Sequence, residues 1–117
     1  MSVEWLEWEG KQLLYADFRG LSRKELIPNL ELAASMLEAS PGEVLFLINF
    51  EGVSIHFAYL RRCSELGQKI IHPKTKRMAI LGMDGVKAAM LVTFNKIVGQ
   101  KSASFKTEQE AKNWLTR

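Results

Sequence analysis

The sequence has 117 residues, of which 47% are hydrophobic and 25% are charged. This composition is typical of an ordinary globular domain and excludes a disordered, a collagen-like or a disulfide-framed chain. The formal net charge of +3 is too small by itself to imply a polyanionic partner.

A single domain over residues 1–117 is expected, because compact domains commonly contain roughly 100–150 residues and no linker or repeat divides the chain. The one cysteine, Cys63, cannot close an internal disulfide, and no Cys/His cluster has zinc spacing. This cysteine usage suits a reducing compartment. No apolar run approaches the ~20 residues that a membrane-spanning helix needs. We therefore expect a cytoplasmic protein with no metal or other cofactor and no membrane span.

The charges are distributed unevenly along the chain. Residues 1–60 hold 4 Lys or Arg against 9 Asp or Glu, whereas residues 61–117 hold 12 against 4. If the halves segregate in space, the domain is dipolar and could steer a charged partner. Interleaved strands and helices would instead mix the two halves, and we favour the resulting ordinary solvated faces. The densest basic stretch has only Tyr59 near it for base stacking, which makes nucleic acid an unlikely partner. That stretch contains Arg61, Arg62, Lys69, Lys74, Lys76 and Arg77.

The chain begins with a predicted hairpin, in which strands over 3–8 and 12–18 flank a turn at 9–11. Ser22 and Glu25 then form a capping box at the start of a helix. Pro28 lies just past the first turn and lacks an N–H, so a kink or a late helix start is expected. The spacing of the apolar residues predicts that this helix buries Leu26, Leu30, Ala33, Ala34 and Leu37.

A continuous apolar run over 44–50 predicts a central strand that is covered on both faces. A second helix should follow from about Ile55 and stop before Pro73. Ser54 is a good N-cap for this helix. Its inward stripe is predicted to contain Tyr59, Cys63, Leu66 and Ile70.

The rest of the chain repeats the alternation of strand and helix. Residues 77–81 predict another buried strand, and 82–85 a strand-to-helix turn. Residues 102–106 alternate between polar and apolar side chains, as in an edge strand with one face exposed to solvent. A second capping box at Thr107 and Glu110 opens the last helix. The third helix should point Val86, Met90, Phe94 and Ile97 inward, and the last should bury Ala111, Trp114 and Leu115.

The predicted order is therefore ββαβαβαβα, an α/β fold with a mixed, mostly parallel sheet and helices on both faces. Trp5 and Trp8 should point to opposite faces of their strand, so one of them is expected to be partly exposed. An exposed tryptophan would favour a homodimer contact.

Several segments resemble the STAS family, and especially its SpoIIAA-like branch of anti-sigma-factor antagonists. The similarity covers nearly the whole chain and lies mostly at core and capping positions. It implies a bacterial, non-enzymatic module that binds other proteins, including regulators or a kinase. The segments that carry the resemblance are 15–21, 44–50, 76–82, Phe105 and 110–115.

The resemblance also implies a serine at the start of the second helix that a partner kinase phosphorylates. Ser54 is the best match, and it would make the chain an anti-sigma-factor-antagonist-type switch. The sequence departs from the family here, because the acidic-Ser-Ser-Gly run is absent and Val53 precedes the serine. A phosphate at Ser54 would be favoured by the helix dipole and opposed by Glu51.

Residues at the ends of the two central strands form the predicted ligand or partner surface, because ligands of open α/β sheets bind beyond the carboxyl ends of the strands. An alternative function is binding of a small anionic or lipid-like ligand in this crevice. A catalytic pair of Ser54 and His56 would also need an orienting acid and an oxyanion site. The two aspartates, Asp17 and Asp84, both lie on other segments, so a hydrolase is disfavoured. The surface contains Asn49, Glu51, Ser54, His56, Gly82, Asp84, Gly85 and Lys87.

Overall fold

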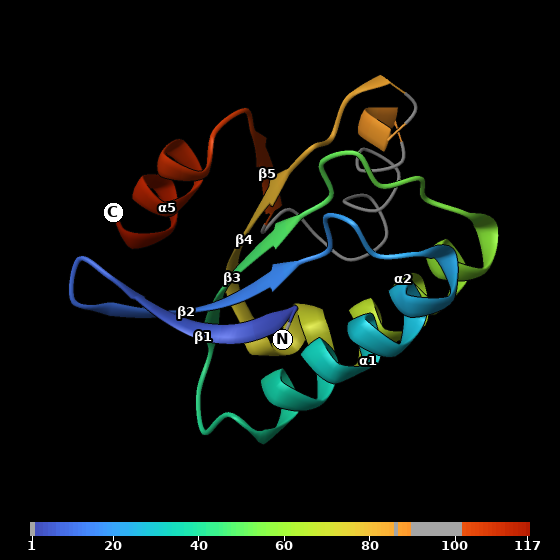
Figure 1. The fold of residues 1–117 in the computed structure, drawn as a ribbon. Helices are drawn as coiled ribbons and strands as arrows, with labels where there is room; N and C mark the ends of the chain where they lie inside the picture. Colours follow the sequence, from blue (N-terminus) through green and yellow to red (C-terminus); the bar gives the residue numbers. More distant parts are fainter. Residues whose placement is uncertain (1, 86, 90–101) are drawn as a thin grey trace.

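The central element is a five-stranded sheet with the strand order β1-β2-β3-β4-β5. A computed structural model describes residues 2–85, 87–89 and 102–117 of the chain (Figure 1). Strand β1 is antiparallel to β2, and the remaining neighbours are parallel. The strands are β1 (Val3–Trp8), β2 (Lys11–Asp17), β3 (Val44–Asn49), β4 (Thr75–Leu81) and β5 (Ser102–Phe105).

Helices cover both faces of this sheet, with α1 and α2 on one side and α5 on the other (Figure 1). Strands β3 and β4 therefore have two buried faces, which explains their continuous apolar sequence. Residues 85 and 87–89 are also helical. The predicted α/β class and mostly parallel sheet are confirmed. The helical elements with printed bounds are α1 (Arg23–Ala39), α2 (Phe57–Leu66), η1 (Gly67–Ile71), α3 (His72–Lys74) and α5 (Glu108–Thr116).

Helix α1 begins at Arg23, after the N-cap Ser22. Of the two effects predicted for Pro28, a kink or a late helix start, the late start is therefore wrong. The Glu25 carboxylate accepts the backbone N–H of Ser22 at 2.8 Å, which fixes the start well before the proline. Pro28 is exposed inside the helix and costs it one hydrogen bond. All five predicted inward residues of this helix are buried.

Helix α2 begins later than predicted, and its N-cap is His56 rather than Ser54. The buried Val53 donates its backbone N–H to the Phe50 carbonyl at 3.0 Å, which closes a turn after β3. Val53 and Ile55 are β-branched and favour extended backbone between this turn and the helix. His56 accordingly lies before the first turn of α2, not within it.

The second helix also does not stop before Pro73. It continues through the π-helical turn η1 and the short helix α3, which contains Pro73. The His72 N–H bonds to the Gly67 carbonyl, five residues back, so the backbone is widened just before the proline. Pro73 then occupies an early position of α3, where its missing N–H is tolerated.

The C-terminal part follows its prediction closely. Thr107 caps α5 by accepting the Glu110 N–H at 3.2 Å, and β5 lies at the sheet edge. Ala111 and Leu115 are buried, whereas Trp114 is half-buried. The predicted inward stripe of the third helix falls at residues 86, 90, 94 and 97, outside the described residues.

Trp5 and Trp8 point to opposite faces of β1, as predicted. Trp5 is 37% exposed, whereas Trp8 packs with the cluster under α5 and has the Lys112 ammonium 4.9 Å from its ring centroid.

Candidate functional site

The carboxyl ends of β3 and β4 lie side by side, because the two strands are parallel and Asn49 is in register with Leu81. The Phe50 N–H donates to the Leu81 carbonyl at 2.8 Å, which carries the pairing one residue further. The loops that follow both strands therefore begin at the same edge of the sheet. This is the position at which open α/β sheets bind their ligands.

Gly82 brings the two loops into contact. It has a φ of +81°, and a Cβ built on it would lie 2.4 Å from the backbone nitrogen of Glu51. Only glycine fits both this backbone conformation and this close approach. Gly82 therefore has a structural role at the predicted surface.

Two hollows flank Ser54 at this edge. We call them together the strand-end rim. The first, of about 640 Å³, is lined by Leu21, Arg23, Leu26, Gly52, Val53, Ser54, Ile55, His56 and Phe57. The second, of about 480 Å³, is lined by Gly52, Val53, Ser54, Ile55, Asp84, Gly85 and Lys87. The exposed Ser54 thus shares one hollow with His56 and the other with Asp84, Gly85 and Lys87.

Lys87 is the cation of the second hollow. Its ammonium donates to the Phe50 carbonyl at 3.2 Å and lies 3.8 Å from the Asp84 carboxylate. The Asp84 side chain is largely exposed, whereas that of Lys87 is largely buried. The hollow therefore offers solvent a carboxylate more than an ammonium.

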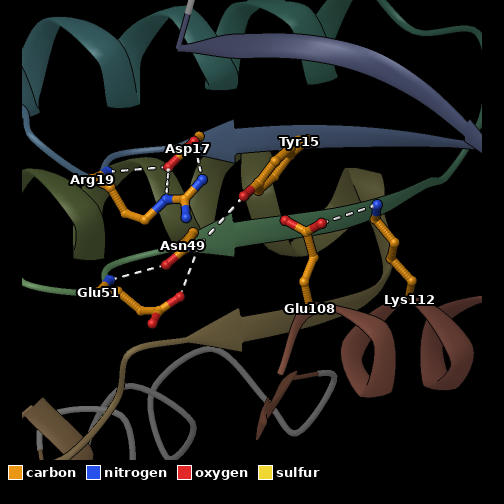
Figure 2. Close-up of polar contacts among 7 residues, drawn as sticks. All are labelled: Tyr15, Asp17, Arg19, Asn49, Glu51, Glu108 and Lys112. Atoms are coloured by element: carbon orange, nitrogen blue, oxygen red, sulfur yellow. Dashed lines mark hydrogen bonds and ion pairs between the residues drawn. The ribbon is translucent and has the colours of Figure 1, made fainter. Parts of the chain in front are cut away.

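Asn49 does not belong to the strand-end rim. It is 1% exposed, and its amide donates to the Tyr15 hydroxyl and to the Glu51 carboxylate, both at 3.3 Å (Figure 2). Its side-chain oxygen accepts the Glu51 N–H at 3.0 Å. The Glu51 carboxylate is thereby drawn toward Asn49 and Tyr15. These side chains belong to a polar cluster of Tyr15, Asp17, Arg19, Asn49, Glu51, Glu108 and Lys112.

Ion pairs complete this polar cluster (Figure 2). Arg19 donates to both carboxylate oxygens of Asp17, each at 2.8 Å. Lys112 lies 3.2 Å from Glu108 at the start of α5. Because Tyr15 belongs to β2 and Glu108 to α5, the cluster links the sheet to the helix that covers it.

The pKa shifts in the polar cluster all point away from neutral pH. Burial raises the pKa of Tyr15 to about 12, and the neighbouring Glu108 carboxylate adds to the effect. Hydrogen bonds from Arg19 lower the pKa of Asp17. Burial opposes the charge of Glu108, but hydrogen bonds from Tyr15 and Lys112 and the charge of Lys112 together lower its pKa. These groups therefore keep one protonation state around pH 7, which suits a structural cluster.

A scan against family models and a search of curated proteins gave no match to the sequence. A search of solved structures found an uncharacterized protein of the DUF3478 family from Shewanella loihica PV-4, described as having a SpoIIAA-like fold. The two chains share 18% identity and superpose with a TM-score of 0.73, over 97% of this chain and 91% of the other. The chain has a SpoIIAA-like fold.

The predicted resemblance is thus confirmed for the fold. Within the SpoIIAA-like fold, Ser54 lies on the loop between β3 and α2, exposed to solvent. It does not cap α2, so the capping explanation for a serine at this position is wrong.

The most exposed large hydrophobic residue in the described part of the chain is Phe57, at 80%, and the sequence prediction missed it. It is the first residue of α2, two positions before Tyr59. The sequence did hold a signal for this exposure, because Phe57 does not belong to the row of residues predicted to face the core from this helix. Arg23 was also missed, because nothing in the sequence places the start of α1 against the loop after β3.

Half of the densest basic stretch has structural partners. Arg62 pairs with Glu31 at 2.9 Å, Lys74 donates to the Ser40 carbonyl, and Arg77 donates to the Trp114 carbonyl at 2.8 Å.

Over residues 2–85, 87–89 and 102–117, no group of acidic, His and Cys side chains is arranged to hold a metal ion. In the same ranges, no helix combines the length and apolar character needed to cross a bilayer.

Proposed function

We propose that this chain is a non-enzymatic module that binds another protein through the strand-end rim. The observation that carries the proposal is the phenyl ring of Phe57, which is 80% exposed beside the first hollow. Large aromatic side chains supply a disproportionate share of the binding energy in protein interfaces. Phe57 is the first residue of α2, so its backbone is already helical before a partner binds.

The shape of the rim supports a protein rather than a small-molecule partner. Two open hollows adjoin across Ser54, and each can receive a side chain of the partner while Phe57 enters a pocket on the other surface. Arg23 and Asp84 place opposite charges at the two hollows, which can fix the orientation of a bound partner.

Ser54 is the proposed regulatory position of this surface. Its side chain is exposed between the hollows, and a phosphate there would add roughly −1.5 to −2 charges. Lys87 is the nearby cation of the second hollow, whereas Asp84 and Glu51 would oppose the phosphate. Because Ser54 lies outside α2, modification would change the partner surface and leave the fold intact. This is the behaviour expected of an anti-sigma-factor-antagonist-type switch in the bacterial cytoplasm.

The test is affinity capture from the source organism with quantitative mass spectrometry, using wild type, Phe57→Ala and Ser54→Asp as baits. We expect Phe57→Ala to reduce recovery of the main partner at least about 10-fold, the loss of one anchor residue. Trp5→Ala is the matched control, because Trp5 is the other exposed aromatic residue in the described part of the chain and neither hollow is lined by a residue of β1. Equal recovery by wild type and Phe57→Ala would contradict the proposed surface, and so would a wild type that captures nothing.

Ser54→Asp is expected to change the recovered partner set, while circular dichroism shows an unaltered fold. An altered fold, or a partner set identical to that of wild type, would argue against regulation at Ser54.

The alternative of a small anionic ligand has less support from the geometry. Gly82 is packed against the Phe50–Glu51 backbone, and the carboxylate of Asp84 is more exposed in its hollow than the Lys87 ammonium. The lipid-like form of this alternative gains no support from the apolar cavity beneath α2, because its volume of about 60 Å³ is below the roughly 150 Å³ that holds benzene.

A further inference from the structure

Strand β1 lies at one edge of the sheet, and no strand of the described chain pairs with its outer side (Figure 1). An unpaired edge presents a row of backbone N–H and C=O groups to which another extended segment can bind. Proteins commonly protect such edges with lysine, proline, a bulge or a very short strand. Residues 3–8 contain no lysine or proline, and their register with β2 is continuous over six residue pairs. The outer edge of β1 therefore has none of these protections.

The register shows which backbone groups point outward. The Asp17 N–H donates to the Ser2 carbonyl at 2.7 Å, so Ser2 is bonded toward β2. In an antiparallel pair, positions bonded to the partner strand alternate with positions whose N–H and C=O point away from it. Val3, Trp5 and Glu7 are therefore the residues with outward backbone groups. No loop or side chain among the described residues hydrogen-bonds to these groups.

The side chains along this edge are two carboxylates with an aromatic ring between them. Trp5 is 37% exposed, and both Glu4 and Glu7 are exposed. Within the described residues, neither glutamate has an ion-pair partner. Because side chains alternate along a strand, Glu4 and Glu7 lie on opposite faces of the sheet. A strand added here would meet one carboxylate on each face and the indole of Trp5.

The lysines closest to this edge are already engaged. Lys11, across the hairpin, donates to the Thr116 carbonyl at 2.8 Å. Lys112, whose ammonium lies over the Trp8 ring, is 3.2 Å from the Glu108 carboxylate. The edge therefore keeps its negative charge. Two copies of β1 side by side would bring the carboxylates of both chains to one seam, and like charges in such a seam are destabilising. Charge complementarity thus favours a basic strand over a second copy of this chain.

We propose that β1 binds an extended basic segment of another protein, which adds to the five-stranded sheet as a further strand. Its backbone pairs with the outward groups, an apolar side chain covers the Trp5 indole, and lysine or arginine side chains meet Glu4 and Glu7. In this mode of recognition, main-chain hydrogen bonds supply affinity and alternate side chains supply specificity. No residue of β1 lines either hollow of the strand-end rim, so the two surfaces can fail independently.

The test is an NMR titration of the full chain with the peptide acetyl-TKVIKT-amide. Its two lysines have the spacing of Glu4 and Glu7, so they can meet both glutamates in either strand direction. We expect saturable binding, with slowed amide exchange at Val3, Trp5 and Glu7 and weaker binding at high salt. The matched peptide acetyl-TEVIET-amide replaces attraction with repulsion and should bind at least about 10-fold more weakly.

Two substitutions at Glu7 separate the backbone contribution from the charge. Glu7→Ala removes the carboxylate but keeps the N–H, and it should weaken peptide binding about 2- to 5-fold. Glu7→Pro also removes the outward N–H and should bind at least about 10-fold more weakly than Glu7→Ala. Proline is tolerated on an edge strand where its missing N–H would face solvent, so Glu7→Pro should remain folded. Equal binding by the two variants would overturn strand addition.

Modified peptides test the same contact with the wild-type chain. N-methyl groups along one edge of the peptide should abolish binding, and those along the other edge should leave it unchanged, because only one edge faces β1. Equal effects of the two patterns, equal affinity for the acidic peptide, shifts centred on Phe57 or no saturable binding would overturn the site. Sedimentation of the wild type as a dimer that Glu7→Pro dissociates would make a second copy the occupant and would also overturn the proposal.

Discussion

Asn49 shows what the pattern of a single strand can and cannot reveal. Alternation along β3 places Asn49 on the same face as Leu47, under α5, and this much can be deduced from the sequence. The partner of its amide could not be deduced, because the Tyr15 hydroxyl comes from another strand, 34 residues away. The predicted surface was therefore wrong in including Asn49, although the strand ends themselves are adjacent.

The contact at Gly82 yields a stability prediction. Gly82→Ala should destabilise the fold by at least about 2 kcal/mol, because the new Cβ meets the backbone of Phe50 and Glu51 and the residue stays left-handed. Gly85→Ala is the matched control, since Gly85 also has a positive φ but a Cβ there meets nothing within 4 Å. The control should cost only about 1 kcal/mol. Urea unfolding measures both, and equal losses would show that the close approach at Gly82 does not matter.

Among the elements, the helical segment that runs from α2 through η1 to α3 shows the limits of local signals. Its inward residues Tyr59 and Leu66 could be predicted from their spacing and are buried. Its start could not, because Val53 and Ile55 are drawn into the core by tertiary packing, which overrides the capping preference of Ser54. The prediction that this helix ends before Pro73 was also wrong, because the π-helical turn η1 widens the backbone and lets the helix continue through the proline.

Helix α5 gives a prediction at the scale of an element. Thr107 caps this helix through its hydroxyl oxygen, and the same hydroxyl donates to the Glu110 carboxylate at 3.0 Å. Thr107→Ala should lower the free energy of unfolding by about 1 kcal/mol. Thr107→Ser keeps the hydroxyl and should remain within about 0.5 kcal/mol of wild type. Chemical denaturation checks both variants, and an equal loss in both would point to the methyl group instead of the cap.

For the whole molecule, the α/β class could be predicted because strand and helix periods alternate along the chain. The order of the strands could not be predicted, because it depends on which edges the crossovers join. The expected mixing of the acidic and basic halves is visible at Arg62, whose partner Glu31 lies in the other half. The tip of the hairpin likewise reaches the C-terminal helix, where Lys11 donates to the Thr116 carbonyl at 2.8 Å.

Three groups with raised pKa values determine how the whole molecule should respond to alkali. Burial raises the pKa of Tyr15 to about 12, that of Cys63 to about 12, and that of Tyr59 well above its ordinary value. Each group is neutral when protonated and ionises first in the unfolded chain, near pH 9.0 for the thiol and 10.0 for the phenols. Their contribution to stability is therefore complete below about pH 9 and is lost as the pH rises toward 12. Urea unfolding over this range should show a falling midpoint, and Tyr59→Phe should make the fall shallower. A midpoint independent of pH, or a slope that the variant leaves unchanged, would mean that these groups ionise equally in both states.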